Sequence, residues 1–145
     1  MHSRRTFILL ALSAAFFGPS REASASCAAI EVRGMSPIQS ALLLADLVFV
    51  GEVQEAELRS DPPRLRVRFR VTESVKGEVT SVMTFETRNL GEDFDFKKGQ
   101  SVLVYMVKVQ GLLSTACSRT RVVAAGDKEV QELQVLSGKA KSSVR

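Results

Sequence analysis

The sequence predicts a mainly β protein whose strands curl into a small closed or nearly closed antiparallel barrel. Three stretches carry this prediction. Residues 64–75 alternate strictly between apolar and charged side chains, as a half-buried strand does, and residues 101–109 are apolar on both faces, as a central strand is. Gly51 interrupts a long strand-like stretch and permits a bulge or bend, so one strand can serve two parts of a curled sheet. A β-sandwich is the competing architecture.

Local signals predict the remaining elements in chain order. A short helix begins after Ser36, with Pro37 at its first position, and ends at Asp46. Five strands are expected, and they cover residues 47–58, 64–75, 82–87, 101–109 and 112–121.

A loop, a second helix and a tail are expected outside these strands. Residues 88–98 are polar and acidic around Phe94 and Phe96, which predicts a loop. Residues 127–136 carry Val130, Leu133 and Leu136 at helical spacing, which predicts a second helix docked on the barrel. Residues 138–145 are expected to form a basic, flexible tail.

The first 25 residues have the features of an export signal. A basic start at Arg4 and Arg5 precedes an apolar run over residues 7–17, and residues 23–25 form a small-x-small cleavage site. The run is too short to span a bilayer, so no transmembrane anchor is expected in the mature chain. Residues 3–8 also resemble the bacterial twin-arginine motif, and the choice between the two export routes stays open. The expected location is periplasmic or secreted.

The chain length and the two cysteines limit the mature protein further. A chain of 145 residues leaves room for one domain, expected over residues 26–137. Cys27 and Cys117 are its two cysteines, and in an oxidising compartment they most simply form one structural disulfide. A lipid-modified Cys27 is the alternative; Ser24 stands where that signal wants a large aliphatic residue. The bond would close a loop of about 90 residues and stabilise the fold by about 4.5 kcal/mol in the chain-entropy model.

Several motifs in order give the chain a resemblance to a known family. They are residues 45–51 (ADLVFVG), 75–77 (VKG), 98–99 (KG) before 102–105 (VLVY), and 113–121 ending in Cys-Ser-Arg-Thr-Arg. Together they cover nearly the whole mature chain. The sequence resembles a netrin-like (NTR) domain and, more narrowly, the bacterial proteins related to tissue inhibitors of metalloproteinases (TIMP-like).

The resemblance implies a five-stranded barrel of the OB type, with Cys27 bonded to Cys117. It also implies an exported binding module, directed at an extracytoplasmic metalloprotease or another protein. Animal inhibitors of this type chelate the protease zinc through the free amine and carbonyl of an amino-terminal cysteine. Here only cleavage after Ser26 would expose Cys27 in that way. The expected contact residues are Ser26, Cys27, Ala28 and Phe94, beside the 88–98 loop.

An alternative function rests on a row of arginines. Four of them occupy alternate positions on one face of a predicted strand, and they are Arg64, Arg66, Arg68 and Arg70. Such a face could bind an anionic polymer or a partner protein. It could equally be a solvated face whose charges pair with glutamates of neighbouring strands.

The composition excludes several other classes of function. The one histidine, His2, lies in the export signal, so the mature chain lacks His-based catalysis and the usual zinc ligand. We therefore expect no enzyme activity, no cofactor and no metal. Arg4, Arg5 and Arg21 against Glu22 place two of the four net positive charges before Cys27. With one tyrosine and no tryptophan for base stacking, no nucleic-acid partner is expected.

Overall fold

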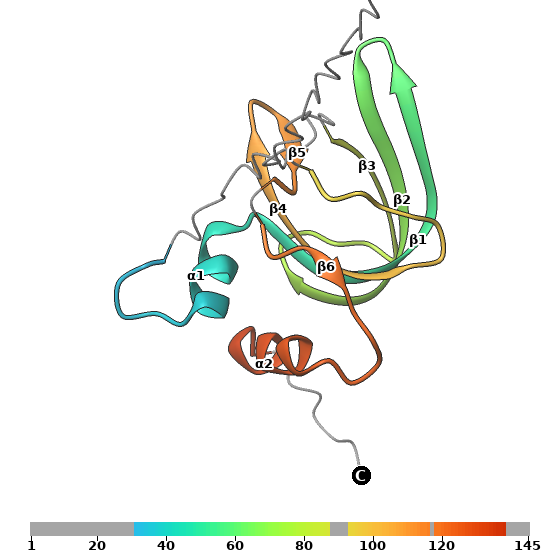
Figure 1. The fold of residues 1–145 in the computed structure, drawn as a ribbon. Coiled ribbons are helices and arrows are strands. Elements are labelled where there is room, and N and C mark those ends of the chain that lie inside the picture. Colours follow the sequence, from blue (N-terminus) through green and yellow to red (C-terminus); the bar gives the residue numbers. More distant parts are fainter. Residues whose placement is uncertain (1–30, 88–92, 117, 139–145) are drawn as a thin grey trace, which may run out of the picture.

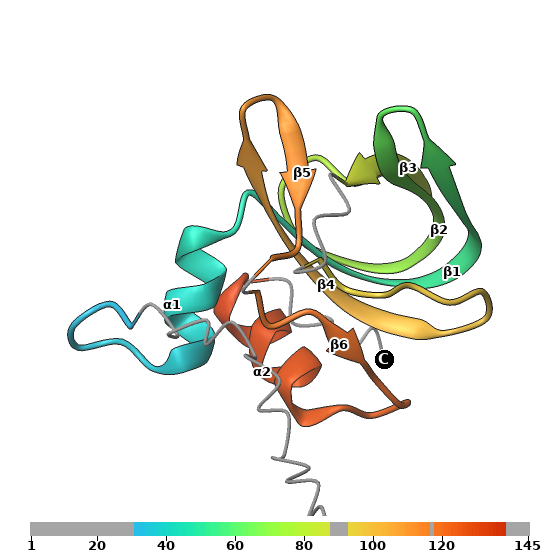
Figure 2. The ribbon, with the colours of Figure 1, turned by 45° about the horizontal axis from the view of Figure 1, so that its top comes forward.

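A curled antiparallel sheet with two helices on its outer side makes up the protein (Figures 1 and 2). The computed structural model describes residues 31–87, 93–116 and 118–138. In chain order the elements are α1 (Pro37–Leu44), β1 (Leu47–Ser60), β2 (Pro63–Lys76), β3 (Val82–Thr87), β4 (Ser101–Val109), β5 (Leu112–Ser114), β6 (Arg121–Val122) and α2 (Lys128–Leu136). The prediction of a mainly β chain with one helix at each end is confirmed.

The strand order is β3-β2-β1-β4-β5, and β6 also pairs with β4. All pairings are antiparallel. The ladder between β1 and β2 shifts register between Val50 and Gly51, as the glycine predicted. A Cβ on Gly51 would lie 3.1 Å from the Phe69 ring and 3.2 Å from the carbonyl oxygen of Arg70, so the bulge also brings two strands very close.

The predicted closed barrel is wrong, because the sheet is a half-barrel. Its edge strands β3 and β5 face each other, and Cα atoms of the two approach within 8 Å. Within the described ranges, however, no backbone ladder joins them. The reason is local: β5 ends after three residues, and the next backbone N–H, that of Thr115, donates to the Asp93 carboxylate at 2.7 Å instead of to a strand.

The predicted single strand over residues 112–121 is also wrong, because β5 and β6 divide it. Between them the chain leaves β4, and a side chain takes over the pairing. Thr120 Oγ1 accepts a hydrogen bond from the backbone N–H of Tyr105 at 2.9 Å and donates to the Tyr105 carbonyl at 3.1 Å. A hydroxyl group thus satisfies the polar groups of β4 where a strand would have done so.

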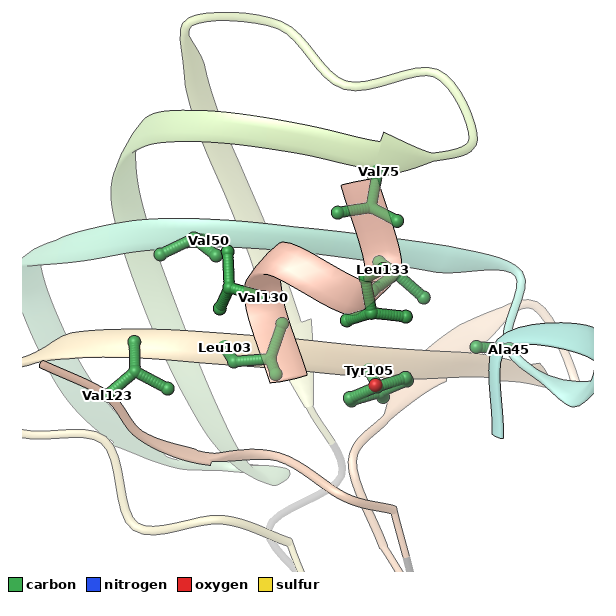
Figure 3. Packing of buried hydrophobic residues seen from close by; sticks show 9 residues of the cluster. Ala45, Val50, Val75, Leu103, Tyr105, Val123, Val130 and Leu133 are labelled. Carbon is green, nitrogen blue, oxygen red and sulfur yellow. The ribbon is translucent and has the colours of Figure 1, made fainter. Parts of the chain in front are cut away.

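The two faces of the sheet carry separate hydrophobic cores. Inside the curl, aromatic rings pack edge to face, with ring centroids of Phe49 and Phe69 5.4 Å apart and those of Phe69 and Phe96 5.2 Å apart. On the outer side, Val130 and Leu133 of α2 pack on β1, β2 and β4 (Figure 3). Residues Val102 to Met106 of β4 are all buried because both cores use them, as predicted for a central strand.

Side chains cap the start of both helices, and the cap of α1 is the predicted one. Ser36 and Gln39 form a capping box at the start of α1, with Pro37 at the first helical position. Asp127 accepts hydrogen bonds from the backbone N–H groups of Glu129 and Val130 at the start of α2. At the other end of α1, Lys76 Nζ donates to the carbonyls of Leu42, Leu43 and Ala45 and so satisfies groups that a helix end leaves open.

Candidate functional site

The segment that follows β3 is held to the end of β5 by one carboxylate. Asp93 Oδ1 accepts hydrogen bonds from Ser114 Oγ at 3.0 Å, from Thr115 N at 2.7 Å and from Thr115 Oγ1 at 3.1 Å. Thr115 Oγ1 in turn accepts from the backbone N–H of Phe94 at 2.8 Å. We call residues 93–96 together with 114–116 the Asp93 junction. These bonds hold Asp93 and Phe94 of the predicted contact loop to Thr115, which lies two residues before position 117 in the sequence.

Phe94, the predicted contact residue, is half-buried in this junction. Its ring centroid lies 4.9 Å from that of Phe96, at an interplanar angle of 62°, and it packs against the inner core. The loop was expected to be polar, and the burial of Phe96 is the part that the sequence reading missed. The two phenylalanines at alternate positions were the available signal, since alternate positions of an extended segment place both rings on the same side, here toward the inner core.

The other members of the predicted contact site lie outside the described residues. These are Ser26, Cys27 and Ala28, the disulfide partner Cys117, and residues 88–92 of the loop. The disulfide and the amino-terminal contact therefore stay predictions. The structure brings together the rest: Phe94, Asp93 and the strand end that leads to Cys117.

The arginine row lies on the outer face of β2, beyond the part that the helices cover. Arg66, Arg68 and Arg70 are exposed, and Arg64 is half-buried. In the ladder, Glu57 lies opposite Arg66, Glu55 opposite Arg68 and Glu52 opposite Arg70. The outer face therefore presents both signs of charge in adjacent rows.

The pairing of these charges is uneven. Arg70 forms an ion pair with Glu52, while Arg59 reaches Glu86 at 3.6 Å. Among the described residues no carboxylate lies within 4.0 Å of a guanidinium nitrogen of Arg66 or Arg68. These two arginines instead line a hollow of about 240 Å³ with Glu55, Glu57, Val82 and Thr84. Of the cross-strand pairs expected for the arginine row, the pair of Arg70 with Glu52 is confirmed, whereas Glu86 pairs with Arg59, which lies outside the row.

The Cys-Ser-Arg-Thr-Arg motif attaches α2 to β4. Glu129, only 8% exposed, accepts hydrogen bonds from Arg119 Nε at 2.8 Å, Arg119 Nη2 at 2.9 Å and the hydroxyl of Tyr105 at 2.8 Å. Arg121 binds Asp127 through both Nη atoms, at 2.9 and 2.7 Å, and reaches Glu129 at 3.2 Å. We call these five side chains the Glu129 network. Both arginines of the motif pair with acids of α2 and its cap, so they have a structural role.

Protonation in the Glu129 network follows from these contacts. Burial alone would raise the pKa of Glu129, but hydrogen bonds from Arg119 and Tyr105 outweigh it and hold the pKa below its ordinary value. Hydrogen bonds from Arg121 lower the pKa of Asp127. Burial, and then the bond to Glu129, raise the pKa of Tyr105. Both carboxylates are therefore ionised and committed to arginines at neutral pH.

Within residues 31–87, 93–116 and 118–138, no group of three or more metal-ligating side chains lies together. In the same ranges, no helix has the length and apolar character needed to cross a membrane. No protein-family model and no curated protein matches this sequence.

Proposed function

We propose that this chain is an exported, non-enzymatic binding module of the netrin-like type, with a half-barrel related to the OB fold. Its location is periplasmic or secreted, and its target is an extracytoplasmic metalloprotease. The fold part of the proposal is supported by the strand order, with β1 between β2 and β4 and the edges of β3 and β5 facing each other.

The observation that carries the binding proposal is the Asp93 junction. Thr115 lies two residues before Cys117 and is fixed to Asp93 and Phe94. A Cys27–Cys117 disulfide would therefore place residues 26–28 beside this junction. A terminus held covalently beside an anchored loop loses little conformational entropy on binding, which favours tight association with a concave active site.

The test begins with the intact mass of the exported protein, with and without reduction and thiol alkylation. A chain that starts at Cys27 with no free thiol presents the amine that a protease zinc could bind. Inhibition is then measured against a panel of extracytoplasmic metalloproteases with fluorogenic peptides. A specific complex should have a Kd well below about 100 µM. If the protein at about 100 µM inhibits no member of the panel, the protease proposal is overturned.

Two variants distinguish the effect of breaking the Asp93 junction from the effect of losing one negative charge in the loop. Asp93→Ala removes the three hydrogen bonds to Ser114 and Thr115, whereas Asp95→Ala removes an exposed carboxylate that reaches only Lys97, at 3.6 Å. We expect Asp93→Ala to weaken inhibition about tenfold, the effect of losing roughly 1.4 kcal/mol, and Asp95→Ala to have a much smaller effect. Equal losses would show that charge, not the fixed loop, is what the target recognises.

One observation favours a second candidate function, the binding of an anionic polymer by the arginine row. Arg66 and Arg68 carry charges that no carboxylate neutralises within 4.0 Å among the described residues. Replacing both by Ser should lower the salt concentration at which the protein leaves a heparin column. Arg70→Ser, on the same strand but paired with Glu52, is the matched control. Unchanged elution of the double variant would rule this function out.

A further inference from the structure

The outer half of β1 lies at a free edge of the sheet. β4 pairs with residues 47–52 of β1, whereas β2 accompanies β1 as far as Ser60, at the tip of the hairpin (Figure 1). Among the described residues, no strand pairs with residues 55–60 on the side away from β2. These residues are exposed apart from Ala56, which is half-buried. We call residues 55–60 the hairpin edge.

The backbone of the hairpin edge has hydrogen-bonding groups directed away from β2. Val71 N donates to the carbonyl of Ser81 on the β3 side of β2, and the ladder between β2 and β3 then runs without a shift to Leu65. Residues at alternate positions face the same neighbour, so Leu65 also bonds toward β3 and not toward β1. Leu58 lies opposite Leu65. Its N–H and C=O therefore point to the open side, where they are a template for another strand.

The side chains of the hairpin edge carry both signs of charge on one face. Alternation places Glu55, Glu57 and Arg59 on the outer face, and Ala56 packs on the inner core. Arg59 has one ion pair, with Glu86 at 3.6 Å, and the two side chains are 47% and 36% exposed. An ion pair this exposed contributes little, so Arg59 can also bind a second carboxylate.

We propose that the hairpin edge pairs with the hairpin edge of a second copy of this chain. The two strands run antiparallel and are related by a two-fold axis at Leu58. Leu58 then exchanges backbone hydrogen bonds with its own copy, and Ala56 does so with Ser60 of the second copy. Glu57 lies opposite Arg59 of the second copy, and symmetry forms this charge pair twice.

The charges select this register over its neighbours. Residues directly opposite in an antiparallel pair point to the same face, so the axis passes through a residue and not between two. An axis at Ala56 would set Glu55 against Glu57. An axis at Glu57 or at Arg59 would set that residue against its own copy. The axis at Leu58 sets Glu57 against Arg59, and like charges directly opposite are destabilising in the other three registers.

The proposed pairing ends at the turn of the hairpin. Asp61 and Pro62 form the turn, so the ladder stops at Ser60. Glu55 and Asp61 of the second copy face each other at this exposed end, where solvent and salt screen their repulsion. The interface is small, so we expect a weak dimer with a Kd of about 10 to 200 µM.

The occupant follows from the sequence of the edge itself. A strand from another protein could use the same backbone groups, but the order Glu57, Leu58, Arg59 is complementary to its own antiparallel copy, which singles out a second copy. Pairing also gives Leu58, 64% exposed, an apolar neighbour. It covers neither the Asp93 junction nor the outer face with the arginine row, so it is independent of the proposed function.

The test is the mass in solution of the exported protein, its amino terminus fixed by intact mass. Sedimentation equilibrium over about 5 to 500 µM should show conversion from monomer to dimer. Glu57→Arg and Arg59→Glu should each raise the dimer Kd about tenfold or more, because each sets like charges opposite one another at two symmetric places. The double variant Glu57→Arg with Arg59→Glu exchanges the charges and should restore the parent Kd to within about threefold.

A matched control excludes an effect of net charge. Glu132→Arg changes the net charge as Glu57→Arg does, at an exposed position of α2, and should dimerise like the parent. Circular dichroism shows that each variant is folded.

Each other result would overturn the proposal. A parent protein that stays monomeric at about 500 µM has no such dimer. A dimer whose Kd is unchanged by Glu57→Arg and by Arg59→Glu uses another surface. A double variant that dimerises as poorly as the single variants would show that residues 57 and 59 do not face each other.

Discussion

Two glycines share one backbone conformation in very different surroundings. Gly77 and Gly99 both have φ of +85°, which strains any residue with a Cβ. At Gly77 a Cβ would lie 2.5 Å from Leu47 Cδ2 and 2.6 Å from the carbonyl oxygen of Asp46, whereas at Gly99 it would meet nothing within 4 Å. The turn after β2 therefore needs glycine both for its positive φ and for the lack of space, whereas the turn before β4 needs it for its positive φ alone.

Alanine at each position separates these reasons. We expect Gly99→Ala to lower the free energy of unfolding by about 1 kcal/mol and Gly77→Ala by about 3 kcal/mol or more, since a clash adds to the strain. Urea unfolding of both variants measures the difference. Equal losses would mean that the chain around Asp46 and Leu47 relaxes freely.

Acid should weaken the Glu129 network. The pKa values of Asp127 and Glu129 are lower in the folded chain than their ordinary values, so the folded state binds fewer protons. The resulting stability is fully present above the ordinary carboxyl pKa of about 4 and is lost as pH falls through the lower folded values. Urea unfolding between about pH 6 and pH 2.5 should show this loss.

Replacing one carboxylate identifies the source of the pH dependence. Glu129→Gln should lower the free energy of unfolding at neutral pH by about 2 kcal/mol, because Arg119 and Tyr105 lose a charged acceptor. It should also flatten the loss below pH 4. Glu132→Gln, an exposed glutamate of the same helix, is the control. A parent-like acid profile in Glu129→Gln would place the dependence elsewhere.

At the scale of elements, the C-terminal end of the helix α1 is stabilised by a side chain from the strand β2. Lys76 of β2 reaches the open carbonyls at the end of α1, a favourable place for a cation because the helix dipole is negative there. Lys76→Met should lower the free energy of unfolding by about 1 to 2 kcal/mol. Lys128→Met, exposed at the start of α2, is the control and should change little. Hydrogen exchange in residues 41–45 should rise only in the first variant.

The elements also show how far the sequence could predict the structure. Residues 82–87 and 101–109 are strands with the predicted bounds, because both stretches are rich in strand-forming apolar residues and too short for the alternative, a buried helix. Residues 112–121 divide because the side chains of Thr115 and Thr120 form hydrogen bonds with residues distant in sequence, Phe94 and Tyr105, which no local pattern reveals. Leu136, the last residue of α2, fits the predicted helical stripe yet is 38% exposed, so the stripe overstates how much of the helix is buried.

At the scale of the whole molecule, the predicted Cys27–Cys117 bond would join the start of the mature chain to the end of the sheet. Reduction should then lower the free energy of unfolding by about 4.5 kcal/mol, the effect of opening a loop of about 90 residues. Urea unfolding of the exported protein with and without reductant measures it, with thiol alkylation as the check on the number of free cysteines. An unchanged midpoint with no free thiol in the starting protein would contradict the pairing.

The candidate site was less predictable than the fold. Asp93 and Thr115 are 22 residues apart, and nothing in their neighbourhoods marks them as partners. The arginine row was visible in the alternation of residues 64–75, but which arginines are paired depends on the register of β1, which the bulge between Val53 and Glu55 sets. Periodicity therefore predicts faces, while contacts across the sheet require its geometry.

The central position of β4 has a consequence for the order of folding. Val48 and Val50 of β1 are covered only after β4, and then Leu133 of α2, have been synthesised. During synthesis, β4 must therefore emerge before the sheet can close on the inner core, and α2 before it can close on the outer core. Pairings between residues so far apart in sequence make folding slow, in the range of milliseconds to seconds. A nascent chain of this topology would stay unfolded until α2, Lys128–Leu136, has been synthesised.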